Sequence, residues 1–182
     1  MFKPLKILDE KNKILRKKSH EVNFPLTDKD KILIKQMKQH LHYSQLTEES
    51  EKYNLRPGMG LAFPQLGILK RIIVIVYEKT EGEFVEYVLI NPKITSHSVE
   101  QIAAVDGEGC LSVNREIDGH VLRYARISVT AYDENGTQFS LRARDELAIA
   151  IQHEIDHLDG ILFFDKIAKN KPFYTENEIR LI

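Results

Sequence analysis

Residues 145–160 have the sequence DELAIAIQHEIDHLDG, which carries the clearest helical signal in the chain. Apolar residues recur along it at three- and four-residue spacing, and this periodicity predicts a helix with one apolar stripe. Asp145 suits the N-cap of the helix, and Gly160 suits its C-terminal stop. The stripe consists of Leu147, Ile151, Ile155 and Leu158. We therefore expect a buried helix in the C-terminal part of the chain.

The residues before this helix predict strands. β-Branched and aromatic residues gather there in short runs, and Asn135-Gly136 between the last two runs is a hairpin turn signal. The runs are RIIVIVY at 71–77, FVEYVLI at 84–90, a third near 93–105, VLRYARISVTAY at 121–132 and TQFSLRA at 137–143. Together with the helix they predict an α+β fold, in which antiparallel sheets pack around a buried C-terminal helix.

A second helix is expected nearer the N-terminus. Thr27 followed by Asp30 resembles a capping box with Asp in the place of Glu, and it opens an amphipathic segment. The apolar stripe of that segment is Ile34, Met37 and Leu41. Residues 47–57 are expected to form a polar loop. No repeat, low-complexity tract or linker divides the chain, so its 182 residues predict a single domain, 1–182.

The composition is that of an ordinary soluble protein, with 42% hydrophobic and 29% charged residues and a net charge of -1. This balance predicts no membrane association and no sequence-specific nucleic-acid binding. Cys110 is the single cysteine, so no internal disulfide can form and a reducing compartment is favoured. The first residues lack the apolar stretch of a signal peptide, and the run Ile72–Tyr77 is too short to span a bilayer. We expect a cytoplasmic protein.

His153, Glu154 and His157 form an HExxH sequence. On a helix the two histidines lie one turn apart on one face, which suits two ligands of one metal ion. Glu154 lies about 100° around the helix from His153, within reach of a water at that ion. Such a pattern arises by chance at a level of order a few per cent. Burying two imidazoles and a carboxylate without a partner would be costly, so the motif favours a metal site.

A catalytic metal needs a third protein ligand and one open position. Glu176 or Glu178 would complete the usual zinc-protease set, but Pro172 interrupts any helix that would carry them. Cys110 is the better candidate, because the sequence GEGCLS at 107–112 surrounds its thiol with small residues. The competing interpretation is that a lone cysteine is a small buried apolar residue.

The sequence GMGLAFPQLG at 58–67 forms a third cluster. Pro64 and the strand after it exclude the loop-to-helix context of a nucleotide-binding glycine loop. The alternative interpretation is a turn that leads into the strand at 71–77. Such a turn would account for the glycines but not for Gln65. Because a glutamine amide is a good neutral donor for a developing oxyanion, Gln65 is a candidate catalytic residue.

These three segments together resemble the peptide deformylase family, whose members carry G-x-G-x-A-x-x-Q, E-G-C-L-S and H-E-x-D-H in that order. In this chain they are GMGLAFPQ, EGCLS and HEIDH. The resemblance covers most of the chain and is to the longer form typical of Gram-positive bacteria and their relatives. It implies a hydrolase of protein biosynthesis that removes the formyl group from N-formylmethionyl nascent peptides co-translationally and releases formate.

The resemblance also implies a role for each matched residue. A metal-activated water would attack the formyl carbon, with Glu154 as general base and then acid, while Gln65 and the backbone N–H of Leu111 hold the formyl oxygen. The implied metal ligands are Cys110, His153 and His157, with Fe2+ as the expected ion and Zn2+, Ni2+ or Co2+ as alternatives in a purified protein. The implied substrate-binding residues are Gly60, Met59, Ile149 and Ala150, and the implied supporting residues are Glu108 and Arg123.

Three residues depart from the family pattern. Phe63 replaces a small alanine and is expected to narrow or reshape the substrate channel, Asn114 replaces a frequent proline, and Glu146 replaces an apolar pocket residue. Two rival functions are a zinc endopeptidase and a protein that only binds formylated chain ends. The presence of Glu154 argues against the second, because binding alone needs no general base.

Residues 1–40 hold eleven Lys and Arg against five Asp and Glu. A solvated face explains this excess, and contact with ribosomal phosphate is the alternative. That patch would contain Lys11, Lys13, Arg16, Lys17 and Lys18.

Overall fold

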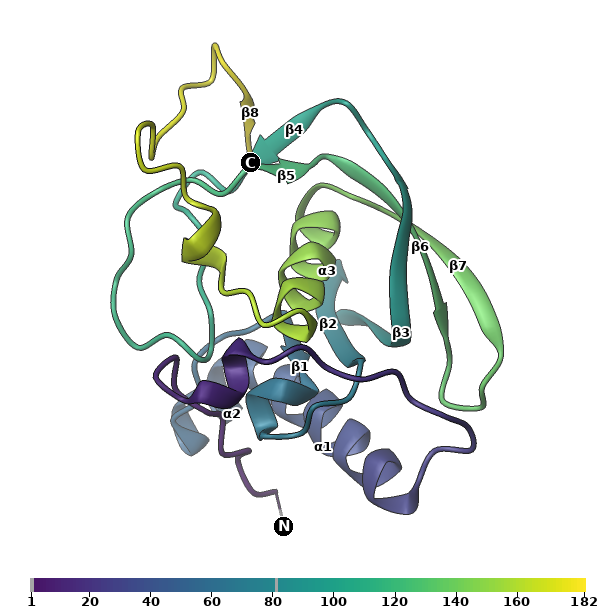
Figure 1. Cartoon of the computed structure of the whole chain (residues 1–182). Helices are drawn as coiled ribbons and strands as arrows, with labels where there is room; N and C mark the ends of the chain where they lie inside the picture. The colour runs from purple at the N-terminus through teal and green to yellow at the C-terminus, as the bar shows by residue number, and fades with distance from the viewer. Residues whose placement is uncertain (1, 81) are drawn as a thin grey trace.

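The computed structural model describes residues 2–80 and 82–182, and helix α3 (Asp145–Leu158) runs through its middle (Figure 1). The predicted C-terminal stop is confirmed. Gly160 has φ +75°, its N–H donates to His157 O, and the N–H of Ile161 donates to Asp156 O, which is a Schellman motif. The predicted N-cap is wrong, because α3 begins at Asp145 itself, whose carboxylate binds arginine side chains instead of the helix backbone.

The predicted antiparallel sheet is confirmed. Its five strands have the order β1-β2-β3-β6-β7, and every neighbouring pair is antiparallel. The strands are β1 (Gly60–Ala62), β2 (Ile72–Thr80), β3 (Glu83–His97), β6 (Arg126–Tyr132) and β7 (Gln138–Arg144). The sequence predicts separate strands at 84–90 and near 93–105, but β3 joins the first of them to the start of the second.

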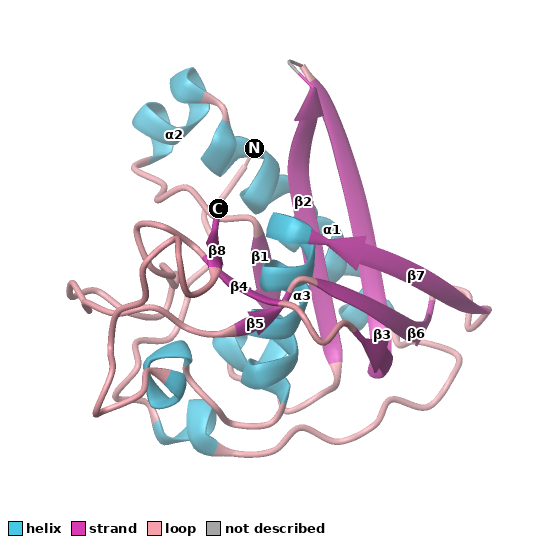
Figure 2. Ribbon diagram, turned by 90° about the horizontal axis from the view of Figure 1, so that it is seen from above, coloured by secondary structure: helices cyan, strands magenta, loops and turns pink. Residues whose placement is uncertain are grey.

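A second, smaller sheet contains β5 (Arg123–Tyr124), β4 (Gln101–Ala103) and β8 (Arg180–Leu181) in that order. β4 pairs with β8 in parallel, so the purely antiparallel prediction fails at this one place. Figure 2 shows these three short strands side by side, away from the long strands of the main sheet. The small sheet brings the C-terminal segment next to α3.

The turn predicted at Asn135-Gly136 joins β6 to β7, with Tyr132 opposite Gln138. Gly136 takes the left-handed conformation, with φ +83°, while Asn135 does not. The Asp133 carboxylate accepts the N–H groups of Asn135 and Thr137, both at 2.8 Å. The connection is therefore a longer loop than the two-residue turn that Asn-Gly most often forms.

Helix α1 (Asp28–Gln45) begins where it was predicted. The Thr27 hydroxyl accepts the N–H of Asp30 and donates to the Asp30 carboxylate, which also pairs with Lys70. The polar loop predicted at 47–57 is wrong in its first part, which forms the short helix α2 (Thr47–Tyr53). The sequence of α2, TEESEKY, is almost entirely polar, so it lacks the apolar periodicity by which a helix is recognised. The Tyr53 ring instead packs against other rings at one end of α1.

The main sheet buries apolar residues on both faces. Alternate residues of β2 point to opposite sides, so Ile72 and Val74 pack toward α1, whereas Ile73 and Ile75 pack toward α3. The predicted stripe of α1 is fully buried in the first of these cores: Ile34, Met37 and Leu41. Phe63 is fully buried in the same core, so the expectation that it narrows the substrate channel is wrong.

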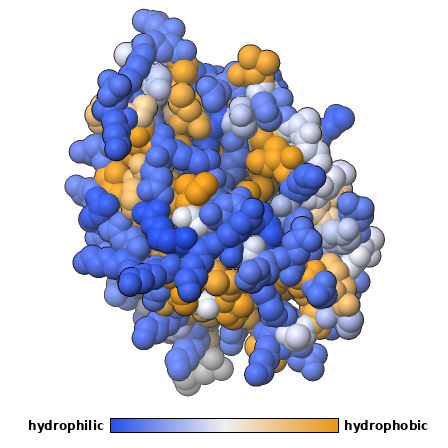
Figure 3. Space-filling model, in the orientation of Figure 1, coloured by the Kyte–Doolittle hydropathy of each residue, from blue (hydrophilic) through white to orange (hydrophobic). Residues whose placement is uncertain are grey.

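Figure 3 shows one face of the molecule, on which apolar side chains form separate patches among hydrophilic ones. Such scattered exposure is normal for a folded domain. Of the helices in the described residues, none has the length and hydropathy that a membrane span requires.

Candidate metal centre

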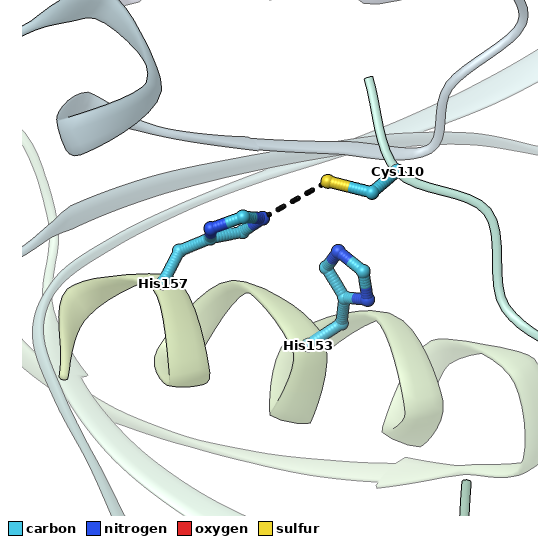
Figure 4. A group of neighbouring side chains, drawn as sticks. All are labelled: Cys110, His153 and His157. Carbon is cyan, nitrogen blue, oxygen red and sulfur yellow. Dashed lines mark hydrogen bonds between the residues drawn. The ribbon is translucent and has the colours of Figure 1, made fainter. Parts of the chain in front are cut away.

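Cys110, His153 and His157 lie together, as predicted. One ligand atom from each residue lies within 4.8 Å of the others, and Cys110 Sγ is 3.3 Å from His157 Nε2. Figure 4 shows both imidazoles projecting from one face of α3 toward the thiol, which belongs to the loop between β4 and β5. The helix provides the spacing of the histidines, and the loop brings the sulfur to them.

This group has the chemistry of a catalytic metal site. Around a tetrahedral ion, a sulfur at about 2.3 Å and a nitrogen at about 2.0 Å lie roughly 3.5 Å apart, close to the separation seen here. Three such ligands leave one position open for water or substrate. Among the described residues, the Glu154 carboxylate has a buried oxygen, Oε2, without a hydrogen-bond partner. The residues present therefore fit a divalent ion with a water beside Glu154.

The alternative ligands proposed from the sequence lie elsewhere. Glu176 and Glu178 are exposed, and Glu178 forms an ion pair with Lys171. Neither belongs to the group of ligand atoms around His153. This position contradicts the ligand set of an ordinary zinc endopeptidase.

Glu108 orients His153. Its Oε2 lies 2.8 Å from His153 Nδ1, so the other ring nitrogen, Nε2, is left for the ion. Glu108 also forms a two-fold contact with Arg123, at 2.7 and 2.9 Å. Burial would raise the pKa of Glu108, but hydrogen bonds from Arg123 and His153 lower it to about 2. The carboxylate is therefore ionised and holds the imidazole in one orientation.

Arg123 joins two carboxylates, one of which contacts His153. Its side chain is only 1% exposed, and it binds Asp156 as well as Glu108. Asp156 also pairs with Lys166 near the surface. Sequence reasoning missed Asp156 and Lys166, although Asp156 lies in the HEIDH motif three residues after His153, on the same side of the helix.

Replacing Arg123 with Met is expected to lower the free energy of unfolding by about 3–5 kcal/mol, because two buried carboxylates lose their partner. Denaturant unfolding would measure the loss. Arg126→Met is the matched control: Arg126 pairs with Glu100 on the surface, where its side chain is 58% exposed, so the change should be much smaller. Equal stability of the two variants would contradict the role given to Arg123.

Gln65 faces the thiol with a fixed amide. Its Oε1 accepts the N–H of Ala62 at 2.8 Å, and its Nε2 donates to Ser112 Oγ at 3.2 Å and lies 3.9 Å from Cys110 Sγ. These contacts settle which end of the amide carries the N–H groups, and they point those groups at the site. Ser112 is fully buried and was not predicted.

Arg56 holds the loop that carries Cys110. Its guanidinium donates to the carbonyls of Leu111 and Val113, which fixes the peptide that follows the thiol. Arg56 lies at the end of the polar loop expected at 47–57, and no sequence pattern indicates its role. A Pro follows it in the sequence, which marks a turn but does not show where the side chain goes.

A cavity of about 550 Å³ opens onto the group. Its wall includes the predicted substrate-binding residues, which are Met59, Gly60, Ile149 and Ala150, and also Glu146 and Ile182. Phe63 is absent from this wall. A Cβ atom at Gly60 would lie 2.5 Å from Glu154 Oε1, so only glycine lets β1 pass this close to the carboxylate.

Burial raises the pKa of Glu154 to about 7, although the positive charge of the neighbouring His153 acts to lower this pKa.

The family model described as polypeptide deformylase matches residues 4–173 of this chain. The chain belongs to the polypeptide deformylase family. A peptide deformylase from Listeria monocytogenes is 48% identical over 173 residues, which is 95% of this chain and 94% of the relative. Peptide deformylase 2 from Bacillus cereus is 46% identical over 172 residues, which is 94% of each chain. A crystal structure of a probable peptide deformylase from Synechococcus phage S-SSM7 superimposes with a TM-score of 0.74 at 38% identity, covering 89% of this chain and 99% of that one.

Membership agrees with the resemblance first carried by the GMGLAFPQ, EGCLS and HEIDH segments. Deformylases are hydrolases that act on N-formylmethionyl peptides and depend on a metal, and this chain contains a group that fits one. The enzyme class is therefore that of a deformylase, with a formylmethionyl peptide as its substrate class.

Proposed function

We propose that this deformylase works through a divalent ion held by Cys110, His153 and His157, with Glu154 as its general base. The observation that carries the proposal is the position of Glu154. Its carboxylate is buried beside a ligand of the ion, faces Gly60 in the cavity wall, and has one oxygen without a partner. A carboxylate confined in this way can exchange a proton with a water between itself and the thiol.

A divalent ion bound by these three ligands would lower the pKa of the attacking water toward neutrality. The ligands accept Fe2+, Zn2+, Co2+ or Ni2+, and the family resemblance favours Fe2+. Cys110 must be a thiolate to bind, and the His153 ring must present Nε2, which its contact to Glu108 arranges.

Glu154 would move the protons. It takes one from water as the water oxygen bonds to the formyl carbon, and the formyl oxygen becomes negative. The amide of Gln65 and the backbone N–H of Leu111 would donate to that oxygen. Glu154 then gives the proton to the leaving nitrogen as the carbon–nitrogen bond breaks. The products are formate and a free amino terminus, so every atom of the water is used.

Side-chain specificity would come from the cavity wall. Met59, Ile149 and Ala150 offer apolar surface, and the backbone of Gly60, at the outer edge of the main sheet, would hydrogen-bond the peptide. The formyl group is small, so recognition falls to the methionine side chain and the first backbone groups.

Formate release from formyl-Met-Ala-Ser by protein purified without oxygen tests the function. We expect turnover that needs the metal and leaves the internal peptide bonds intact. Cleavage of an internal bond would favour the endopeptidase instead. Tight binding without formate release would favour a protein that only captures formylated chain ends.

The proposal includes a cytoplasmic location and contact with the ribosome, because formylated nascent chains emerge from ribosomes in the cytoplasm. All five residues of the basic patch are exposed, and four of them are lysines: Lys11, Lys13, Lys17 and Lys18. Arg16 pairs with Asp165 and lies over the Phe164 ring, so it serves the protein's own fold. Reversing the four lysine charges is expected to weaken co-sedimentation with ribosomes, most clearly at low salt. If co-sedimentation were unchanged, the basic patch would be only a solvent-exposed face without a role in ribosome binding.

A further inference from the structure

One wall of the substrate cavity comes from outside the matched family region. The family model ends at residue 173, whereas β8 and the following Ile182 lie beyond it. Figure 1 and Figure 2 both show β8 beside β4. Ile182 nevertheless lines the cavity that contains the metal ligands. The wall at this point is therefore formed by the C-terminal segment that contains β8 and Ile182.

Two sets of contacts hold Ile182 in place. Its N–H donates to Ala103 O at 3.0 Å, and its carbonyl accepts the N–H of Val105 at 2.8 Å. Arg180 then ties the strand to both neighbours, because it binds Glu100 ahead of β4 and Asp145 at the start of α3. Ile182 is thus fixed between the small sheet and the first turn of the helix.

The side chain of Ile182 packs against Ile149, which lies one turn of α3 before His153. It adjoins the buried cluster that contains Ile149, which also lines the cavity. Along α3 the cavity extends from His153 back to Glu146, seven residues or about 10 Å along the helix axis. A methionine side chain reaches roughly 7 Å from the formyl carbon to its terminal methyl group, over six bonds of about 1.5 Å each. The methyl group would therefore reach the level of Ile149, about 6 Å along the helix from His153, where Ile182 packs.

The polarity of this end also points to Ile182. Glu146 is exposed and contributes a carboxylate to the rim, which cannot cover an apolar methyl group. The apolar surface there comes from Ile149 on the helix and from Ile182 on the neighbouring segment. Their packing gives the distal end of the cavity an apolar wall of fixed depth.

We propose that Ile182 closes the distal end of the methionine pocket and is a specificity-determining residue, which limits the length and bulk of the side chain accepted. This rests on the proposed function, because it assumes that the formyl carbon lies beside Glu154. β8 and Arg180 act as positioning elements that hold Ile182 at the end of the pocket.

The test compares kcat/KM for formyl-Met-Ala-Ser with kcat/KM for formyl-Phe-Ala-Ser, in the metal-loaded full-length enzyme. Ile182→Ala is expected to reduce the preference for Met over Phe by about tenfold, because several methylene groups of the wall are removed. The change should come chiefly from KM, with kcat for the Met peptide altered far less. Arg180→Met, which releases β8, should shift the preference in the same direction.

Phe173→Ala is the matched control, since Phe173 is an exposed apolar residue of the same C-terminal segment that packs on His120 and does not line the cavity. Its preference should equal that of the wild type. An unchanged preference in both Ile182→Ala and Arg180→Met, or an equal loss on both peptides, would overturn the proposal. A wild-type enzyme that releases no formate from either peptide would instead contradict the proposed function.

Discussion

Glu154→Gln is expected to reduce formate release by about 10²–10⁴-fold while metal content and fold stay unchanged. Glutamine has nearly the same shape as glutamate, so it keeps the close packing against Gly60. Its amide cannot take a proton from water or return one to the leaving nitrogen. Because one group performs both transfers in the proposed mechanism, the loss should lie toward the upper end of that range.

Hydrolysis and metal content should be measured on the same preparations. Glu176→Gln is the control, because it makes the same chemical change at an exposed position away from the site, and it should keep full activity. Near-normal hydrolysis by Glu154→Gln would remove Glu154 from the mechanism. Loss of the metal from this variant would show that the carboxylate supports binding of the ion and would leave its role as a base unproven.

The part of the site on α3 was predictable from local periodicity. His153 and His157 are four residues apart on a helix whose apolar stripe is clear, so their common face follows from helical geometry. Cys110 was different, because it lies on a loop 43 residues before His153 in the sequence, and no local rule brings it there. It was favoured because small residues surround its thiol in GEGCLS and because the three segments resemble one family, and its sulfur lies 3.3 Å from His157 Nε2.

The contacts that were missed depend on tertiary packing. The charges of Arg56 and Asp156 were visible in the sequence, but their partners are the carbonyl of Leu111 and the guanidinium of Arg123, distant along the chain. Phe63 was misjudged for the same reason. Its neighbour Gln65 faces the site, and the turn of the chain at Pro64 sends Phe63 into the core under α1.

The parallel pairing of β8 could not have been derived either. Two-residue strands carry too little sequence for an alternating pattern, and their stability comes from the neighbours that they meet. β8 pairs with β4 because the chain after α3 returns along the small sheet, and Arg180 then meets Glu100 and Asp145. Each residue of this contact looks like an ordinary surface charge when the sequence is considered alone.

Protein purified without oxygen is expected to contain ferrous iron and to lose its activity in air. By affinity alone the site would prefer zinc to iron, so the expectation of iron rests on the family resemblance. Its consequence follows from the ligands. The thiolate of Cys110 would lie beside a redox-active ion with an open position, where oxygen can oxidise either the iron or the sulfur. Nickel- or cobalt-substituted protein should keep its activity longer.

Cys110→Ser is expected to bind iron poorly and to lose most of its activity with any metal, because a neutral hydroxyl replaces a charged soft ligand. Metal analysis after purification would measure the first loss, and formate release would measure the second. Since Cys110 is the single cysteine, mass spectrometry of aerated wild-type protein reports oxidation of this thiol directly, without interference from another. Stoichiometric zinc with full activity in air would contradict the iron assignment. The assignment of the protein as a hydrolase would still stand, since zinc held by the same three ligands can also activate water.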